Sequence, residues 1–134
     1  MTLVVDASFL VAALIDTGRH GSWATDQMHG ATIVGPHLLP IEVASVLRRA
    51  AIAGDISPDV ATLAHADLLD LPLRLLAYDL VADRAWQLRG NIGIYDACYV
   101  AIAEELDAPL ATLDLRLARA PGPRCTFAVP PAAS

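Results

Sequence analysis

Residues 3–15 read LVVDASFLVAALI and join a short apolar run, one acidic residue and a longer apolar segment. The run 3–5 is continuous, which is typical of a strand buried on both faces, and Asp6 ends it. Residues 7–15 are rich in helix-forming side chains, and Gly18 follows as a stop signal. The chain is therefore expected to open with a buried strand, a carboxylate and a helix.

Short apolar runs and longer helical patterns alternate along the rest of the chain. Further strands are expected at residues 32–34, 73–77, 109–112 and 126–129. Further helices are expected over residues 22–28, 39–53, 57–69, 80–89, 94–106 and 115–120. The strands lack alternation of polar and apolar residues, as is typical of a parallel sheet covered by helices on both faces. These patterns predict an α/β fold that forms one domain over residues 1–134.

Composition narrows the chemistry. Of the 134 residues, 55% are hydrophobic and 18% charged, which suits one domain with a sizeable core. The formal charge is −6, and all nine basic residues are arginines. The lack of lysine excludes P-loop nucleotide binding and Schiff-base catalysis. The net acidity argues against a general nucleic-acid binder, because such binding depends on a basic surface; a local arginine cluster stays open.

The chain is expected to be soluble and cytoplasmic, with no membrane partner. No apolar stretch approaches the roughly 18 residues that a membrane helix requires. The apolar N-terminal run lacks a basic leader and contains Asp6, so it is not expected to be a signal peptide. Cys98 and Cys125 lie in apolar contexts without CxxC spacing, which favours free thiols in a reducing compartment over a disulfide.

Acidic residues that stand against apolar backgrounds are the candidates for chemistry. They are Asp6 after residues 3–5, Glu42 after residues 38–41, Asp96 within residues 94–103, and Asp114 after residues 110–113. Each also falls near the first turn of an expected helix, so capping of backbone N–H groups is an alternative role for each. Four such positions in one small domain nevertheless predict a shared site.

Asp96 gives the strongest reason to expect a shared site. Residues 94–103 are apolar around the whole helix, so Asp96 is expected to be buried, and a buried unpaired carboxylate costs several kcal/mol unless it is compensated. Residues just past the carboxyl ends of parallel strands gather in one crevice, which would bring Asp6 and Asp114 together, with Glu42 at the same rim. Clustered carboxylates with oxygen ligands alone suit Mg²⁺ or Mn²⁺. A divalent-cation site is predicted.

A family resemblance is carried by four motifs, which cover nearly the whole chain. They are Val4-Val5-Asp6-Ala7-Ser8, Pro40-x-Glu42, Tyr95-Asp96-Ala97-x-Tyr99-Val100-Ala101-x-Ala103, and Leu110-x-Thr112-x-Asp114-x-x-Leu117. In order and spacing they resemble the PIN-domain ribonucleases, most closely the VapC-like toxin branch. The resemblance implies a three-layer sandwich around a parallel five-stranded sheet. It also implies Mg²⁺ or Mn²⁺ held by the four acids, hydrolysis of RNA phosphodiester bonds, and silencing by a VapB-like antitoxin.

Roles can be assigned within this expected site. Asp6 and Asp96 are expected to bind the metal directly, with Asp114 and Glu42 completing the site or holding water. Ser8 and Thr112 lie two residues from strand-end acids and are expected to orient a carboxylate or a water. Ordinary hydrogen bonding in a helix or turn is the alternative for both hydroxyls.

Other residue types are given lesser roles. The histidines at 20, 29, 37 and 65 lie in separate segments and form no expected ligand set. Trp23, Trp86, Tyr95 and Tyr99 are expected at core positions and do not suggest a platform for stacked bases. The apolar stretch 39–76 is expected to expose a patch that a second copy covers, so a homodimer is predicted.

Two alternative functions are set against a ribonuclease toxin. A metal-dependent phosphatase acting on small phosphate esters would suit the acidic charge, but phosphatases with an aspartyl nucleophile open with Asp-x-Asp, whereas this chain has Asp6-Ala7-Ser8. A non-catalytic PIN-like interaction module would be expected to lack some of the acids, and all four are present. The ribonuclease is the favoured hypothesis.

Overall fold

The structure, a computed structural model, describes residues 1–133. Its helices and strands follow in the order β1 (Thr2–Val5), α1 (Ala7–Ile15), α2 (Arg19–Met28), β2 (Thr32–Pro36), α3 (Leu39–Ile52), α4 (Pro58–Asp70), β3 (Arg74–Leu76), η1 (Tyr78–Leu80), α5 (Ala82–Gln87), η2 (Leu88–Gly90), α6 (Ile94–Glu105), β4 (Leu110–Ala111), α7 (Leu115–Arg119) and β5 (Phe127–Ala128). Strands and helices alternate, which confirms the predicted α/β class.

The strands form one sheet with the order β3-β2-β1-β4-β5, and every neighbouring pair is parallel. β1 lies at its centre, with Val4 opposite Val34 of β2 and Val5 opposite Ala111 of β4. Leu3, Val4 and Val5 are fully buried, as their continuous apolar run predicts. All five strands therefore end at one edge of the sheet, where the acidic residues follow.

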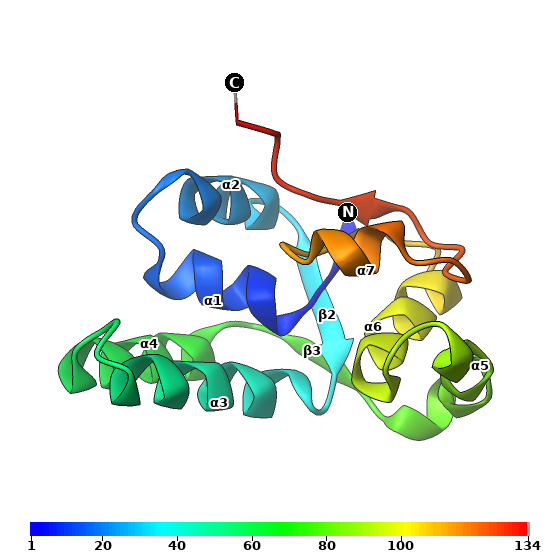
Figure 1. The fold of residues 1–134 in the computed structure, drawn as a ribbon, viewed down its shortest axis with the longest axis horizontal. Helices are drawn as coiled ribbons and strands as arrows, with labels where there is room; N and C mark the ends of the chain where they lie inside the picture. Colours follow the sequence, from blue (N-terminus) through cyan, green and yellow to red (C-terminus); the bar gives the residue numbers. More distant parts are fainter. Residues whose placement is uncertain (134) are drawn as a thin grey trace.

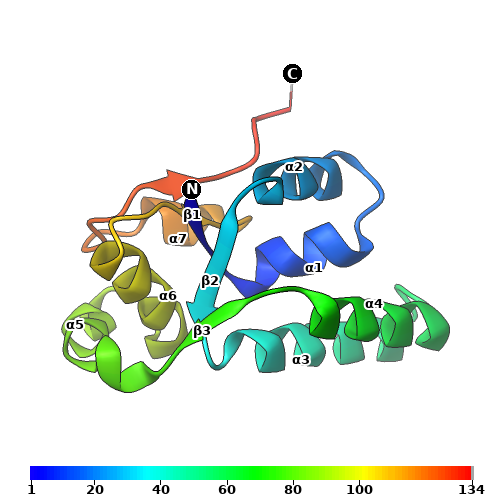
Figure 2. The same ribbon diagram turned by 180° about the vertical axis from the view of Figure 1, so that it is seen from behind.

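Helices cover both faces of the sheet. α6 packs against β1, β2 and β4, and α5 packs on α6. On the other side α1 contacts α2, α3 and α4. Figures 1 and 2 show the two groups of helices from opposite directions, with the sheet between them. The predicted three-layer sandwich around a parallel five-stranded sheet is confirmed.

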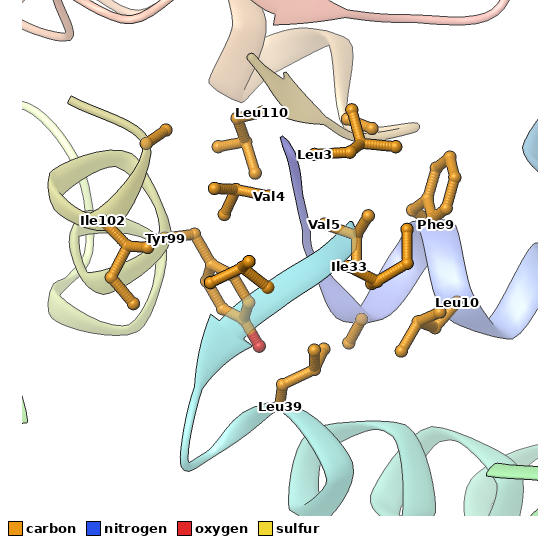
Figure 3. Packing of buried hydrophobic residues seen from close by; sticks show 14 of the residues in the cluster. Leu3, Val4, Val5, Phe9, Leu10, Ile33, Leu39, Tyr99, Ile102 and Leu110 are labelled. Carbon is orange, nitrogen blue, oxygen red and sulfur yellow. The ribbon is translucent and has the colours of Figure 1, made fainter. Parts of the chain in front are cut away.

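The core lies where α1, α3 and α6 meet the central strands. Figure 3 shows Leu3 and Leu110 on neighbouring strands, with Phe9 of α1 near Leu3 and Tyr99 of α6 near Val4. Phe9 is fully buried and meets Trp23 of α2 edge to face, with 5.5 Å between ring centroids. The ring contact packs α2 on α1, and the buried rings of Phe9 and Tyr99 anchor α1 and α6 in the core.

Several helix boundaries differ from those predicted. α2 begins at Arg19 rather than residue 22, because the N–H of Gly18 donates to Oδ1 of Asp16 at 2.7 Å and turns the chain early. The helix predicted over residues 80–89 is the shorter α5 between the 3-10 turns η1 and η2. Helical periodicity does not separate a 3-10 turn from the end of an α-helix, so the longer span was predicted.

The predicted burial of the aromatic residues is wrong for two of them. Tyr99 is buried and Trp23 half-buried, as expected for core residues. Trp86 is 58% exposed and Tyr95 65% exposed. Tyr95 lies in the first turn of α6, where Ile94 is exposed as well and the buried residues begin only at Ala97. Because Tyr95 is exposed, its ring is available for stacking on a base, which the sequence did not predict.

Two further predictions can be compared with the fold. Cys98 and Cys125 are both free thiols, as predicted, although Cys125 is only half-buried. No helix within residues 1–133 has the length and apolar character needed to cross a membrane.

Candidate active site

Asp6 stands at the junction between β1 and α1 and is only 6% exposed. Its Oδ1 accepts hydrogen bonds from the Ser8 hydroxyl at 2.6 Å and from the Phe9 N–H at 3.1 Å. Its Oδ2 accepts from the Thr112 hydroxyl at 2.5 Å. Three donors, two from the first turn of α1 and one from the segment after β4, therefore fix the orientation of this carboxylate while it also caps α1.

Thr112 and Ser8 connect Asp6 to the turn that carries Asp114. The Thr112 hydroxyl donates to Asp6 and accepts from the Asp114 N–H at 2.9 Å. The Ser8 hydroxyl likewise accepts from the Leu113 N–H at 3.0 Å. Both hydroxyls thus orient a carboxylate and stabilise a turn at once, so the two roles expected from the sequence are not exclusive.

Asp114 caps α7 and accepts hydrogen bonds from the N–H groups of Arg116 and Leu117 at 3.0 and 3.3 Å. Nε of Arg116 lies 3.9 Å from Oδ1 of Asp114, but the Arg116 side chain is 96% exposed, so this ion pair is weak. Arg116 is not among the residues predicted for the site, although its position two residues after Asp114 indicates a local pair.

Asp96 lies in the first turn of α6 and is half-buried, not fully buried as predicted. The neighbouring Tyr95 is exposed, so this turn is only partly covered. Burial raises the pKa of Asp96, and the negative charges of Asp114, Asp6 and Glu42 raise it further. The four carboxylates are therefore close enough to interact electrostatically. The charges of the other three each favour the neutral form of Asp96.

Glu42 lies in the first turn of α3, where its Oε1 accepts a 2.6 Å hydrogen bond from the Tyr99 hydroxyl. Tyr99 is 1% exposed, and Figure 3 shows its hydroxyl directed toward Leu39 at the start of α3. Burial raises the pKa of Tyr99, and the bond to Glu42 raises it further. The Tyr99 hydroxyl therefore stays protonated and serves as a fixed donor, a role that the sequence analysis missed.

Burial also raises the pKa of Asp6 above its usual value, and the charge of Asp114 raises it further. The hydrogen bonds from Ser8, Thr112 and Phe9 act in the opposite direction but do not outweigh burial. Ionising Asp6 in the folded protein therefore costs more free energy than in water, and a nearby positive charge would lower that cost.

The donor chemistry of this edge fits a hard divalent cation, because the four acids offer only oxygen ligands. Among residues 1–133, however, no three Asp, Glu, His or Cys side chains converge closely enough to hold one metal ion. Like charges repel, which favours separated carboxylates unless a cation neutralises them. The side chains thus form an acidic edge whose donors suit Mg²⁺ or Mn²⁺, without a finished coordination sphere.

Two cavities lie at opposite ends of the strands, and the larger one is not beside the acidic residues. A cavity of about 580 Å³ includes Pro109, just before β4, and Thr126, just before β5, so it opens at the amino ends of these strands. Its charged groups include Arg84 and Glu104, which are already paired at 2.6 Å. A smaller cavity of about 320 Å³ lies at the carboxyl ends of β2 and β3 and includes Tyr95, next to Asp96. Ligands of open α/β sheets bind at carboxyl ends, so the smaller cavity lies on the relevant side.

Comparison with known proteins decides the family. Residues 3–123 match the PIN domain family. The chain belongs to the PIN-domain family. It is 40% identical over 132 residues to Ribonuclease VapC1 of Mycobacterium tuberculosis, covering 91% of this chain and 92% of that relative. Within the family, this PIN domain therefore groups with the VapC ribonucleases, as its four motifs predict.

Solved structures give the same fold. The crystal structure of PAE2754 from Pyrobaculum aerophilum superposes on this PIN domain with a TM-score of 0.67 at 25% identity, covering 95% of this chain and 83% of that one. VapBC2 from Rickettsia felis, bound to a DNA fragment from their promoter, gives a TM-score of 0.64 at 13% identity over 96% and 98% of the two chains. The second likeness concerns the fold alone.

Proposed function

We propose that this PIN domain is the toxin of a toxin-antitoxin pair and hydrolyses RNA phosphodiester bonds at the edge formed by Asp6, Glu42, Asp96 and Asp114. One observation carries the proposal: Asp6, Glu42, Asp96 and Asp114 lie at the carboxyl edge of the parallel sheet in a VapC-type fold. The pKa of Asp96, raised by burial and further by the charges of the other three acids, agrees with this grouping. Membership of the VapC ribonucleases favours RNA over small phosphate esters as substrate.

Asp6 and Asp96 would bind Mg²⁺ or Mn²⁺ directly, and Asp114 and Glu42 would complete the site or hold water. When bound, such a cation stabilises charge on phosphoryl oxygens and makes water a better nucleophile. The protein's part is positioning. Ser8 and Thr112 hold the Asp6 carboxylate in one orientation, and Tyr99 does the same for Glu42.

The partners of the site follow from its charge and from the surface around it. A VapB-like antitoxin that places a guanidinium among the four acids would satisfy them without a metal.

A homodimer would cover exposed apolar side chains of α3 and α4, among them Ile41 at 71%, Leu63 at 66% and Leu69 at 68% exposure. A cytoplasmic location suits a protein that acts on RNA, and residues 1–134 would act as one domain.

The proposal is tested by cleavage of single-stranded RNA with Mg²⁺, with Mn²⁺ and with excess EDTA. Asp96→Asn should lower kcat/KM by more than about 100-fold, because loss of a ligand should cost more than the 10–100-fold typical of an outer partner. Asp67→Asn removes the same charge from an exposed position on α4 and should cleave like the wild type. Full activity in EDTA, or in Asp96→Asn, would contradict the proposed site.

A further inference from the structure

The cavity of about 320 Å³ beside the acidic edge has walls from three parts of the chain. Residues 36–38 form one wall where β2 runs into α3. Tyr78 forms a second wall just after β3. Ile94, Tyr95 and Cys98 form the third from the first turns of α6. The cavity is therefore built by elements that also carry the candidate site.

Two backbone hydrogen bonds fix the cavity walls, and one of them leads to the acidic edge. The His37 N–H donates to the carbonyl of Leu76 at 3.0 Å, which holds the segment after β2 against the end of β3. The Glu42 N–H donates to the carbonyl of Leu38 at 2.9 Å, so one cavity wall leads directly into the turn that carries Glu42. The wall of the cavity and the position of this carboxylate are thus fixed together.

On α6 the cavity and the acidic edge are joined directly, because Tyr95 of the cavity wall immediately precedes Asp96. Successive residues of an α-helix are about 100° apart around the axis, so these two side chains occupy adjacent sectors of the same turn. Neighbouring strands are about 5 Å apart, and the end of β2 lies beside the end of β1, where Asp6 stands. The cavity therefore lies within the span of a short ligand that also reaches the carboxylates.

The chemistry of the walls suits a flat, uncharged, aromatic ligand. Tyr95 is 65% exposed and Tyr78 44% exposed, so both rings offer surface to a ligand. None of the wall residues within the described chain carries a carboxylate or a guanidinium. The phenol hydroxyls and the exposed His37 ring add polar groups. The volume lies at the small end of the range for ligand sites, about 300–1,000 Å³, which favours one planar group over a peptide helix.

We infer that this cavity is a nucleobase subsite, which holds one unpaired base of the RNA next to the phosphodiester bond that the carboxylates cleave. The inference rests on the proposed function and names the residues that would bind the substrate next to the cleaved bond. Unstacked bases of single-stranded RNA are bound by stacking on aromatic side chains and by hydrogen bonds to their edges. Tyr95 and Tyr78 are the residues that would stack on the base, and Tyr95 immediately precedes Asp96 in the chain.

The subsite is tested with a short single-stranded RNA that the wild type cleaves at one bond, and with versions that carry an abasic nucleotide at each position around that bond. One abasic position should lower the kcat/KM of the wild type by about 5- to 150-fold, the range for losing one stacked base. Tyr95→Ala and Tyr78→Ala should show that loss on intact RNA, mainly in KM, and little further loss on the abasic RNA. Tyr95→Phe keeps the ring and should resemble the wild type.

Trp86→Ala is the matched control, because Trp86 is an aromatic residue of similar exposure outside the cavity. It should keep the full abasic penalty of the wild type. Equal abasic penalties in the wild type and Tyr95→Ala would overturn the subsite while leaving the ribonuclease intact. If Tyr95→Ala instead changes the mass measured by light scattering, with equal abasic penalties, the cavity is a protein contact and the inference is wrong.

A wild type that cleaves no RNA in Mg²⁺ or Mn²⁺ would contradict the proposed function, and binding then tests the subsite separately. The same RNA with 2-aminopurine at each position in turn reports stacking through quenching of its fluorescence. Quenching by the wild type that is lost in Tyr95→Ala supports the subsite without any turnover. Equal quenching, or none at any position, overturns it. Thermal melting of each variant verifies that the exposed substitutions leave the fold intact.

Discussion

The hydroxyl of Tyr99 donates a 2.6 Å hydrogen bond to Oε1 of Glu42 and ties α6 to α3 at the carboxyl edge of the sheet. The two residues are 57 positions apart in the chain. The Tyr99 ring is packed among core side chains, so the position of a candidate metal-binding carboxylate depends directly on the packing of the core. Stability and activity should therefore respond together at this contact.

Tyr99→Phe keeps the packed ring and removes only the donor to Glu42. The free energy of unfolding should fall by about 1 kcal/mol, because one hydrogen bond is lost and water can reach the half-buried Glu42. RNA cleavage should fall by about 10-fold, the lower range for partners that orient a ligand. Urea denaturation and cleavage kinetics measure the two effects. Unchanged kinetics in a variant of reduced stability would limit Tyr99 to a structural role.

Asp96 should make the protein less stable as pH rises. Its pKa in the folded state is raised above the ordinary value of 3.8, so between these two pKa values the folded chain binds more protons than the unfolded chain. The contribution of Asp96 to stability is then most favourable below about pH 4 and falls as pH rises through its folded pKa. In EDTA at pH 7, Asp96→Asn should be more stable than the wild type, by less than about 1 kcal/mol because water screens this half-exposed group.

Thermal melting at pH 3.5 and pH 7 checks this prediction for Asp96, and the gain in Asp96→Asn should vanish at the lower pH. Asp67→Asn, on the exposed face of α4, should show no such gain at either pH. A loss of stability in Asp96→Asn at pH 7 would mean that the carboxylate supports the helix as a cap.

Local sequence patterns predict which acids lie at the site, but they do not predict contacts between helices that are distant in the chain. Asp6 and Asp114 were predicted because each follows an apolar strand directly, and the ends of parallel strands meet at one edge. The bond between Tyr99 and Glu42 depends on how α6 and α3 are placed on either side of the sheet, which no local pattern contains. Asp96 is less buried than its apolar segment predicts, because an apolar helix does not show which of its turns stays partly exposed.

Glu104 should show the opposite pH dependence from Asp96. Burial raises the pKa of Glu104, but hydrogen bonds from the Arg84 guanidinium at 2.6 Å and from the Arg124 N–H at 2.7 Å outweigh it and hold the pKa below 4.5. Its contribution to stability is therefore present above pH 4.5 and lost as pH falls through the folded pKa. Glu104→Gln should lose about 1–3 kcal/mol at pH 7 and little in strong acid.

Urea denaturation across pH 3 to 7 measures the effect of Glu104→Gln. The exposed neighbour provides the control, since Glu105→Gln removes the same charge without breaking a pair. Equal stability of the two variants at pH 7 would show that the Arg84 contact contributes nothing measurable.

Gly21 marks the closest approach of α2 to the end of α1. A Cβ added there would lie 1.8 Å from the carbonyl oxygen of Asp16 and 2.9 Å from that of Ala12. Backbone atoms cannot move aside as a flexible side chain can, so Gly21→Ala must displace α2 and should cost about 1–3 kcal/mol or more. Gly90→Ala meets nothing within 4 Å and should leave stability nearly unchanged in the same urea titration.

A divalent cation should stabilise the folded protein, and the effect should depend on pH. A ligand that binds only the folded state adds about 2.7 kcal/mol at 100 times its Kd. The carboxylates must be ionised to bind it, and the pKa values of Asp6 and Asp96 are both raised, so the stabilisation should weaken as pH falls from 7 toward 4. Melting with Mn²⁺, against NaCl of matched ionic strength, measures this shift. It should nearly disappear in Asp96→Asn and persist in Asp67→Asn; an equal shift in all three proteins would place the cation away from the acidic edge.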